Sequence, residues 1–264
     1  MTNVLKGLAI GTMAAGMMFA QTALPPAAGT APAAAAPAGP SPDEIKDLQA
    51  IQSKAIATPA DADARMAAIN AFVAKYPTSQ FKGYALTMAG EAAQGKGDSG
   101  RARFYYEQAI AADPNSDYAM IMLGADIAQN IKPNAMDKAA QVAKATKLAN
   151  DALGLIAKRT KQPQETQAQF DAEKSSDISR AHMTLGLAAM GDEKYEAAGK
   201  EFILASDADA MNLLRAGMAF NNGKKVDEAD AALNKFIAVP GLPDQYKKMA
   251  EDEKKRGQQI KAGK

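Results

Sequence analysis

Three closely spaced glycines, in the segment Gly95–Gly100, come nearest to a phosphate-binding site in this sequence. Their spacing is G-x-G-x-x-G, the pattern of a turn whose backbone amides hold the pyrophosphate of a dinucleotide at a helix start. That turn requires a β-strand before its first glycine. Residues 84–94 instead have the apolar spacing of a helix. The sequence therefore predicts a turn between two helices and no bound cofactor.

Within this turn, the glycines are expected to end one helix before the next begins. Gly95 and Gly97 can supply the left-handed backbone conformation that only glycine adopts cheaply. Asp98 or Ser99 then serves as N-cap of the following helix, because a short polar side chain can accept a hydrogen bond from its free amides.

Side chains suited to catalysis or metal binding are scarce. The chain has one histidine, His182, and no cysteine, which excludes disulfides, thiolate sites and the usual zinc site with several histidines. No G-x-S-x-G elbow accompanies His182. Most acidic residues fall at expected helix starts or on outward faces. We therefore expect no catalytic residues, no metal site and no small-molecule substrate.

The overall charge also excludes one class of partner. Lysine and arginine number 31, and aspartate and glutamate number 30. Such a balance gives no basic field for nucleic acid, whose binding depends on neutralising phosphates. We therefore expect protein or peptide partners. The many alanines and few β-branched residues favour helix throughout.

The N-terminus is typical of an export signal. Residues 1–23 contain Lys6, then an uncharged apolar run from Gly7 to Ala20, too short to span a bilayer comfortably. Residues 24–42, rich in alanine and proline, predict a flexible linker. We expect an exported bacterial protein located in the periplasm, or one anchored in the inner membrane if the leader stays uncleaved.

From residue 43 onward, apolar residues recur at three- and four-residue steps, and glycine, proline, asparagine or aspartate interrupts them. The folded part opens on an S-x-x-E capping box at residues 41–44. An internal repeat is also present, since Tyr84 and Tyr118 are 34 residues apart, as are Gly90 and Gly124. A period of this length indicates stacked helical hairpins.

The residues at the repeated positions resemble the signature of the tetratricopeptide repeat family, a helix–turn–helix unit of 34 residues, of the type found in exported bacterial proteins. The signature residues are Gly90, Ala102, Tyr106, Ala109, Pro114, Leu123, Gly124, Leu185, Gly186, Ala198, Phe202, Ala205, Gly217 and Ala229. Small residues lie where the two helices of a hairpin cross, and large residues fill the grooves between hairpins. The first hairpin fits less well, because Arg65 occupies the place of a small residue.

The resemblance implies an all-α, right-handed solenoid of about five hairpins with a C-terminal capping helix. The hairpins are expected at 43–76, 83–114, 117–160, 163–206 and 209–240, and the capping helix at 243–261. Gly124 and Gly186 are separated by one repeat plus 28 residues. We assign the extra residues to one elongated hairpin in the middle; a disordered insertion is the alternative.

In this family the first helices of the hairpins line a concave face that binds protein partners. The residues predicted on it are Tyr84, Thr87, Tyr118, Ile121, Arg180, Met183, Met211, Leu214, Arg215, Met218 and Asn221. Such a lining suits a peptide or a partner helix, although several of these side chains could instead pack against the next hairpin. The sequence thus predicts a non-catalytic scaffold of the bacterial envelope. The alternative is a structural component that self-assembles through its long hairpin.

Overall fold

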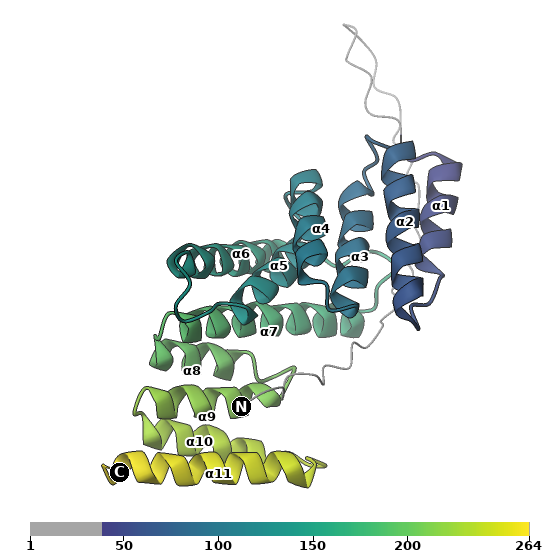
Figure 1. The fold of residues 1–264 in the computed structure, drawn as a ribbon. Coiled ribbons are helices and arrows are strands. Elements are labelled where there is room, and N and C mark those ends of the chain that lie inside the picture. The colour runs from purple at the N-terminus through teal and green to yellow at the C-terminus, as the bar shows by residue number, and fades with distance from the viewer. Residues whose placement is uncertain (1–38, 264) are drawn as a thin grey trace, which may run out of the picture.

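Eleven α-helices follow one another along residues 39–263, the part of the chain that the computed structural model describes (Figure 1). The helices are α1 (Pro42–Gln52), α2 (Pro59–Lys75), α3 (Lys82–Gly95), α4 (Ser99–Ala112), α5 (Asp117–Gln129), α6 (Lys138–Lys158), α7 (Gln167–Gly191), α8 (Tyr195–Leu204), α9 (Met211–Asn222), α10 (Val226–Ile237) and α11 (Asp244–Lys261). These described residues contain no strand. The predicted all-helical fold of sequential hairpins is confirmed.

The helices pair in chain order, as α3 with α4, α5 with α6, α7 with α8, and α9 with α10. In Figure 1, α1 to α4 stand side by side, and α6 to α11 lie across them in a stack that ends at α11. The direction of the helices therefore changes around α5, which packs against α4, α6 and α7. The leader predicted at residues 1–23 and all but the last four residues of the predicted linker lie outside the described residues.

The hairpins are closed by small residues facing large ones. A Cβ atom added to Gly90 would lie 2.5 Å from the Tyr106 ring, and one added to Gly186 would lie 2.6 Å from the Phe202 ring. Gly217 faces Leu233 in the same way, at 2.5 Å. Each glycine thus lets the second helix of its hairpin seat a large side chain directly on the backbone of the first.

A methyl group at Gly90 should therefore be costly. We expect Gly90→Ala to lower the free energy of unfolding by about 1–3 kcal/mol, because the Tyr106 ring is fully buried and has no free space to move into. Gly154 on α6 is the matched control, since it is exposed and an added Cβ would meet nothing within 4 Å. Gly154→Ala should stabilise the chain by about 0.5–1 kcal/mol through helix propensity. Urea unfolding measures both; a Gly90→Ala protein as stable as the parent would contradict this packing.

The start of the folded part differs in one detail from the predicted capping box. Ser41 caps α1, since its Oγ accepts a hydrogen bond from the Glu44 amide at 3.2 Å. The Glu44 carboxylate does not return to Ser41, however, and accepts from the Ser79 hydroxyl instead. The Glu44 carboxylate therefore connects α1 to the turn after α2. Complete capping boxes occur elsewhere, between Thr58 and Asp61 and between Thr166 and Gln169.

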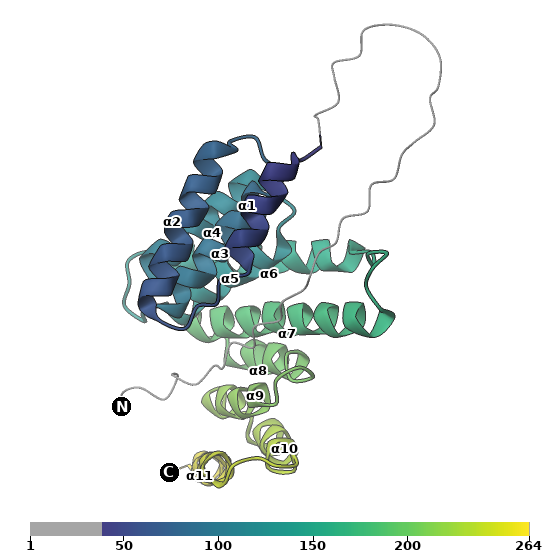
Figure 2. The same ribbon diagram turned by 90° about the vertical axis from the view of Figure 1, so that its right-hand side faces the viewer.

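The elongated hairpin is formed by α6 and α7, with 21 and 25 residues. Both helices are continuous, so the alternative of a disordered insertion is wrong. In Figure 2, their far ends extend beyond the helices above and below them. The next helix, α8, has only 10 residues, so most of α7 has no α8 beside it.

Candidate interaction surface

Seven of the eleven residues predicted for a concave face have side chains that reach solvent. They are Tyr84, Tyr118, Arg180, Met183, Met211, Arg215 and Met218. They come from α3, α5, α7 and α9, the first helices of four consecutive hairpins. Tyr84 is 39% exposed and Met218 is 43% exposed. We call these seven residues the tyrosine–methionine row.

The other four predicted residues are buried, and their assignment to a binding face is wrong. Thr87 is buried, and its hydroxyl donates to the backbone carbonyl of Gly83 in the same helix at 3.0 Å. Ile121 packs into the core formed by α5, α6 and α7. Leu214 and Asn221 are covered from the side of α11.

Asn221 shows how α11 closes the end of the row. The Asn221 amide donates to the backbone carbonyl and to the carboxylate of Glu253, at 3.0 and 2.9 Å. Gly257 allows this approach, since an added Cβ there would lie 2.7 Å from the Asn221 side-chain oxygen. The C-terminal helix therefore covers Asn221 and leaves Met211, Arg215 and Met218 as the predicted residues of α9 that reach solvent.

Tyr118 lies between two charged groups. Its hydroxyl donates to the Glu91 carboxylate at 2.8 Å, and the Arg180 guanidinium lies 5.7 Å from the ring centroid. Burial, followed by the nearby Glu91 charge, raises the pKa of Tyr118 well above its usual range. The phenol is therefore neutral at physiological pH. The arrangement joins α3, α5 and α7 and fixes the orientation of the ring.

A charge cluster beneath this tyrosine holds α7 against α5 and the end of α6. The Arg159 guanidinium lies 2.8 Å from the Asp117 carboxylate and 2.9 Å from the Asp177 carboxylate. Arg180 also lies 3.2 Å from Asp177. Asp177 is almost fully buried, and this burial raises the pKa of its carboxyl, while the bond to Arg159 counteracts the rise. Arg159 therefore compensates two carboxylates that the fold places together.

Two segments of the chain match models of one family, the tetratricopeptide repeat. The matched segments are residues 84–116, which contain most of α3 and all of α4, and residues 211–239, which contain α9 and α10. The chain carries tetratricopeptide repeats. No curated protein matches the sequence.

The tetratricopeptide hairpins also settle the nature of the glycine-rich segment. α3 precedes it, where a dinucleotide site has a strand. Gly97 has a φ of 74°, but Glu193 and Lys224 adopt nearly the same φ, at 60° and 57°, in the turns between α7 and α8 and between α9 and α10. The conformation thus belongs to the turn of the repeat, with or without glycine. The left-handed role predicted for Gly95 is wrong, because Gly95 is the last residue of α3, and Asp98 is the N-cap of α4.

The one histidine takes part in a contact within the hairpin of α7 and α8. His182 Nδ1 lies 2.8 Å from the Glu201 carboxylate, which joins α7 to α8. Among the described residues, no three His, Cys, Asp or Glu side chains are placed to hold a metal ion. None of the helices described has the length and apolar character needed to cross a membrane.

Sequence reasoning missed Glu91, Arg159 and Asp177. A signal for Glu91 exists, since it follows Tyr84 by seven residues, as Met218 follows Met211. Two residues that are seven positions apart lie on the same face of a helix, about two turns from each other. Arg159 and Asp177 carry no such signal, because Arg159 lies between two helices and both contacts cross helix boundaries.

Proposed function

We propose that this chain is a non-catalytic scaffold that binds a peptide or a helix of a partner protein along the tyrosine–methionine row. Tetratricopeptide repeats are protein-binding units, and the chain carries them at both ends of the row. The observation that carries the proposal is the row itself, in which aromatic, arginine and methionine side chains remain partly exposed on four consecutive hairpins.

The chemistry of the row suits a partner with apolar side chains on an extended or helical backbone. Tyr84 and Tyr118 offer rigid rings with a polar edge, which gives contact area at a small entropic cost. Met218 is exposed, and Met183 and Met211 keep part of their side chains free while they pack against the neighbouring cores. The flexible methionine side chain adapts to different apolar shapes. Arg180 and Arg215 are hydrogen-bond donors that can bind carboxylates or backbone carbonyls of the partner.

The proposal includes a location, the periplasm of a bacterial cell. It is supported by residues 1–23, in which a lysine, an apolar run and small residues follow one another in the order typical of an export signal. The alanine- and proline-rich residues 24–42 also support it. Cell fractionation, combined with N-terminal sequencing of the recovered protein, tests it. A mature N-terminus near residue 24 in the periplasmic fraction is expected, and an intact protein in the cytoplasmic fraction would contradict the location.

The binding surface is tested by changing both of its ends. We expect Tyr84→Ala combined with Met218→Ala to reduce partner recovery from an envelope extract at least about ten-fold, since truncating an anchor residue costs more than ~1 kcal/mol of binding. Both side chains are exposed, so the variant should stay folded. Phe104→Ala on α4 is the control, because Phe104 is 54% exposed and lies outside the row. Unchanged recovery with the double variant would exclude the row as the binding surface.

A further inference from the structure

The helix α7 extends well beyond its partner α8. The Ser179 hydroxyl donates to the backbone carbonyl of Ala205, so the end of α8 meets α7 at Ser179. Residues 167–178, which we call the α7 overhang, continue past this point for about 18 Å at 1.5 Å per residue. The long helix α6 covers one side of the overhang. The face of α7 that packs against α8 further along the helix is not covered by α8 at the overhang.

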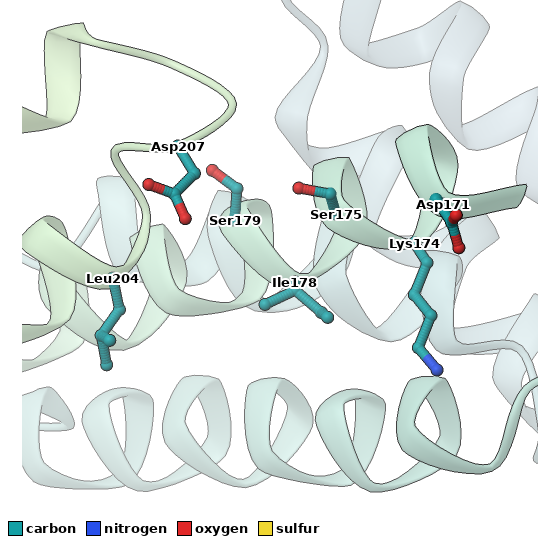
Figure 3. Close-up of a pocket in the computed structure, with 7 residues that line it drawn as sticks. All are labelled: Asp171, Lys174, Ser175, Ile178, Ser179, Leu204 and Asp207. Carbon is teal, nitrogen blue, oxygen red and sulfur yellow. The ribbon is translucent and has the colours of Figure 1, made fainter. Parts of the chain in front are cut away.

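At the step between α8 and the α7 overhang, the surface forms an open hollow of about 310 Å³ (Figure 3). Ile178 lies between Leu204 and Lys174 in this view, and Asp207 approaches Ser179 from the loop after α8. Leu204 is 53% exposed and adds an apolar side chain to this surface. The hollow thus combines an apolar floor with charged residues at both ends.

Four charged residues around this surface form no ion pair with any other described residue. Neither Asp171 nor Asp207 has a basic group within 4.0 Å among the described residues, and Asp171 accepts only from the Gln167 amide. Lys174 lies over the Phe170 ring, at 5.6 Å from its centroid, and pairs with no described carboxylate. Lys161, in the turn before α7, donates only to backbone carbonyls. Two acidic and two basic residues are therefore available for a partner.

We propose that the α7 overhang pairs with the same overhang of a second copy of this chain, antiparallel and about a two-fold axis. If the axis passes midway between residues 171 and 174, Asp171 of each copy lies opposite Lys174 of the other. Every contact in a two-fold interface occurs twice, so one such match gives two ion pairs. The same register sets the small Ser175 opposite the large Phe170.

The hollow at the step then receives the other copy's hairpin turn. In the antiparallel register, the turn at residues 159–166 of one copy reaches the end of α8 in the other. Lys161 of the turn is thereby brought toward Asp207, the second unpaired carboxylate. The two acidic and two basic groups match one another within a single symmetric contact. This self-complementarity favours a second copy over an unrelated basic helix.

The resulting dimer should be weak and sensitive to salt. The overhang is short, so the contact falls in the class of small interfaces below about 1,200 Å² in total area. Its ion pairs are exposed and are screened by added salt. The inference goes beyond the proposed scaffold function, because it uses a surface outside the tyrosine–methionine row. A dimer would carry two rows and could bind a bivalent partner more tightly than one chain does.

Sedimentation of the purified protein over a wide concentration range tests the dimer. We expect the apparent mass to rise from that of one chain toward that of two as the concentration increases. Asp171→Lys and Lys174→Asp should each weaken association about ten-fold, since each replaces two attractive contacts with two repulsive ones. The double variant Asp171→Lys with Lys174→Asp should restore association, because it reverses both charges of each pair.

The control is Lys248→Asp on α11, an exposed lysine away from the overhang with the same change in charge. It should leave association unchanged. A protein that stays monomeric at every concentration would overturn the proposal, and so would a dimer that both single variants leave intact. Failure of the double variant to restore association, while circular dichroism shows it folded, would overturn the proposed register. None of these results depends on whether the tyrosine–methionine row binds a partner.

Discussion

Replacing Phe202 with alanine should lower the free energy of unfolding by about 3–5 kcal/mol, the range found for buried aromatic side chains. Phe202 is 2% exposed and lies directly over Gly186. Its neighbours in the core are mostly alanines, including Ala198 and Ala216. Such short side chains cannot move into the vacated space, so the cavity should stay open and the cost should be at the high end of this range.

Urea unfolding followed by circular dichroism measures this effect, with Phe104→Ala as the matched control. Phe104 is 54% exposed, so its loss should change the free energy of unfolding by less than about 0.5 kcal/mol. Similar losses of unfolding free energy for the two variants would mean that burial of Phe202 against Gly186 does not stabilise the hairpin. A loss confined to Phe202→Ala supports the packing of large residues on glycine.

Replacing Arg159 with methionine should be nearly as damaging, but only when the carboxylates it contacts are ionised. Asp177 has 4% of its side chain exposed and Asp117 has 16%. Without the guanidinium, Asp117 loses its ion pair and Asp177 keeps only the more exposed Arg180, which costs about 3 kcal/mol at neutral pH. Arg101→Met is the control. Arg101 is 53% exposed, and the loss of its exposed ion pairs should cost less than about 1 kcal/mol.

The pH dependence of the Arg159 variant has a definite sign. Burial holds the pKa of Asp177 above its ordinary value of 3.8, and Arg159 limits that rise. A raised pKa in the folded state means that folding favours the protonated carboxyl of Asp177. The contribution of this group to the free energy of unfolding is therefore fully present below pH 3.8 and is lost as the pH rises through the folded-state pKa. Removing Arg159 raises this pKa further. The difference in unfolding free energy between parent and variant should therefore shrink as the pH falls toward 3.8; a constant difference would contradict the assignment.

The helical hairpins could be predicted because their signals are local and repeated. Gly90 and Gly186 recur at the place where a hairpin needs a close approach, and each is followed sixteen residues later by the large residue that covers it, Tyr106 and Phe202. The long helices α6 and α7 followed from the excess of residues between Gly124 and Gly186. None of these inferences needs contacts between distant hairpins.

The exposed residues of the first helices were predicted less well, because exposure depends on what lies next to each helix. The repeat pattern places Leu214 and Asn221 on an open face of α9, but α11 turns back against that helix and covers them. Thr87 and Ile121 lie one turn further along their helices than Tyr84 and Tyr118, where the core closes around α3 and α5. The sequence alone does not say how closely successive hairpins pack.

Photo-crosslinking in cells tests most directly whether the tyrosine–methionine row is the binding surface. A photoreactive amino acid would replace Tyr84 or Met218 in the row, or Phe104 outside it; all three side chains are exposed and can take the substitution. The proposed function predicts the same crosslinked partner from positions 84 and 218 and none from position 104. A partner captured from position 104 but from neither position in the row would contradict it.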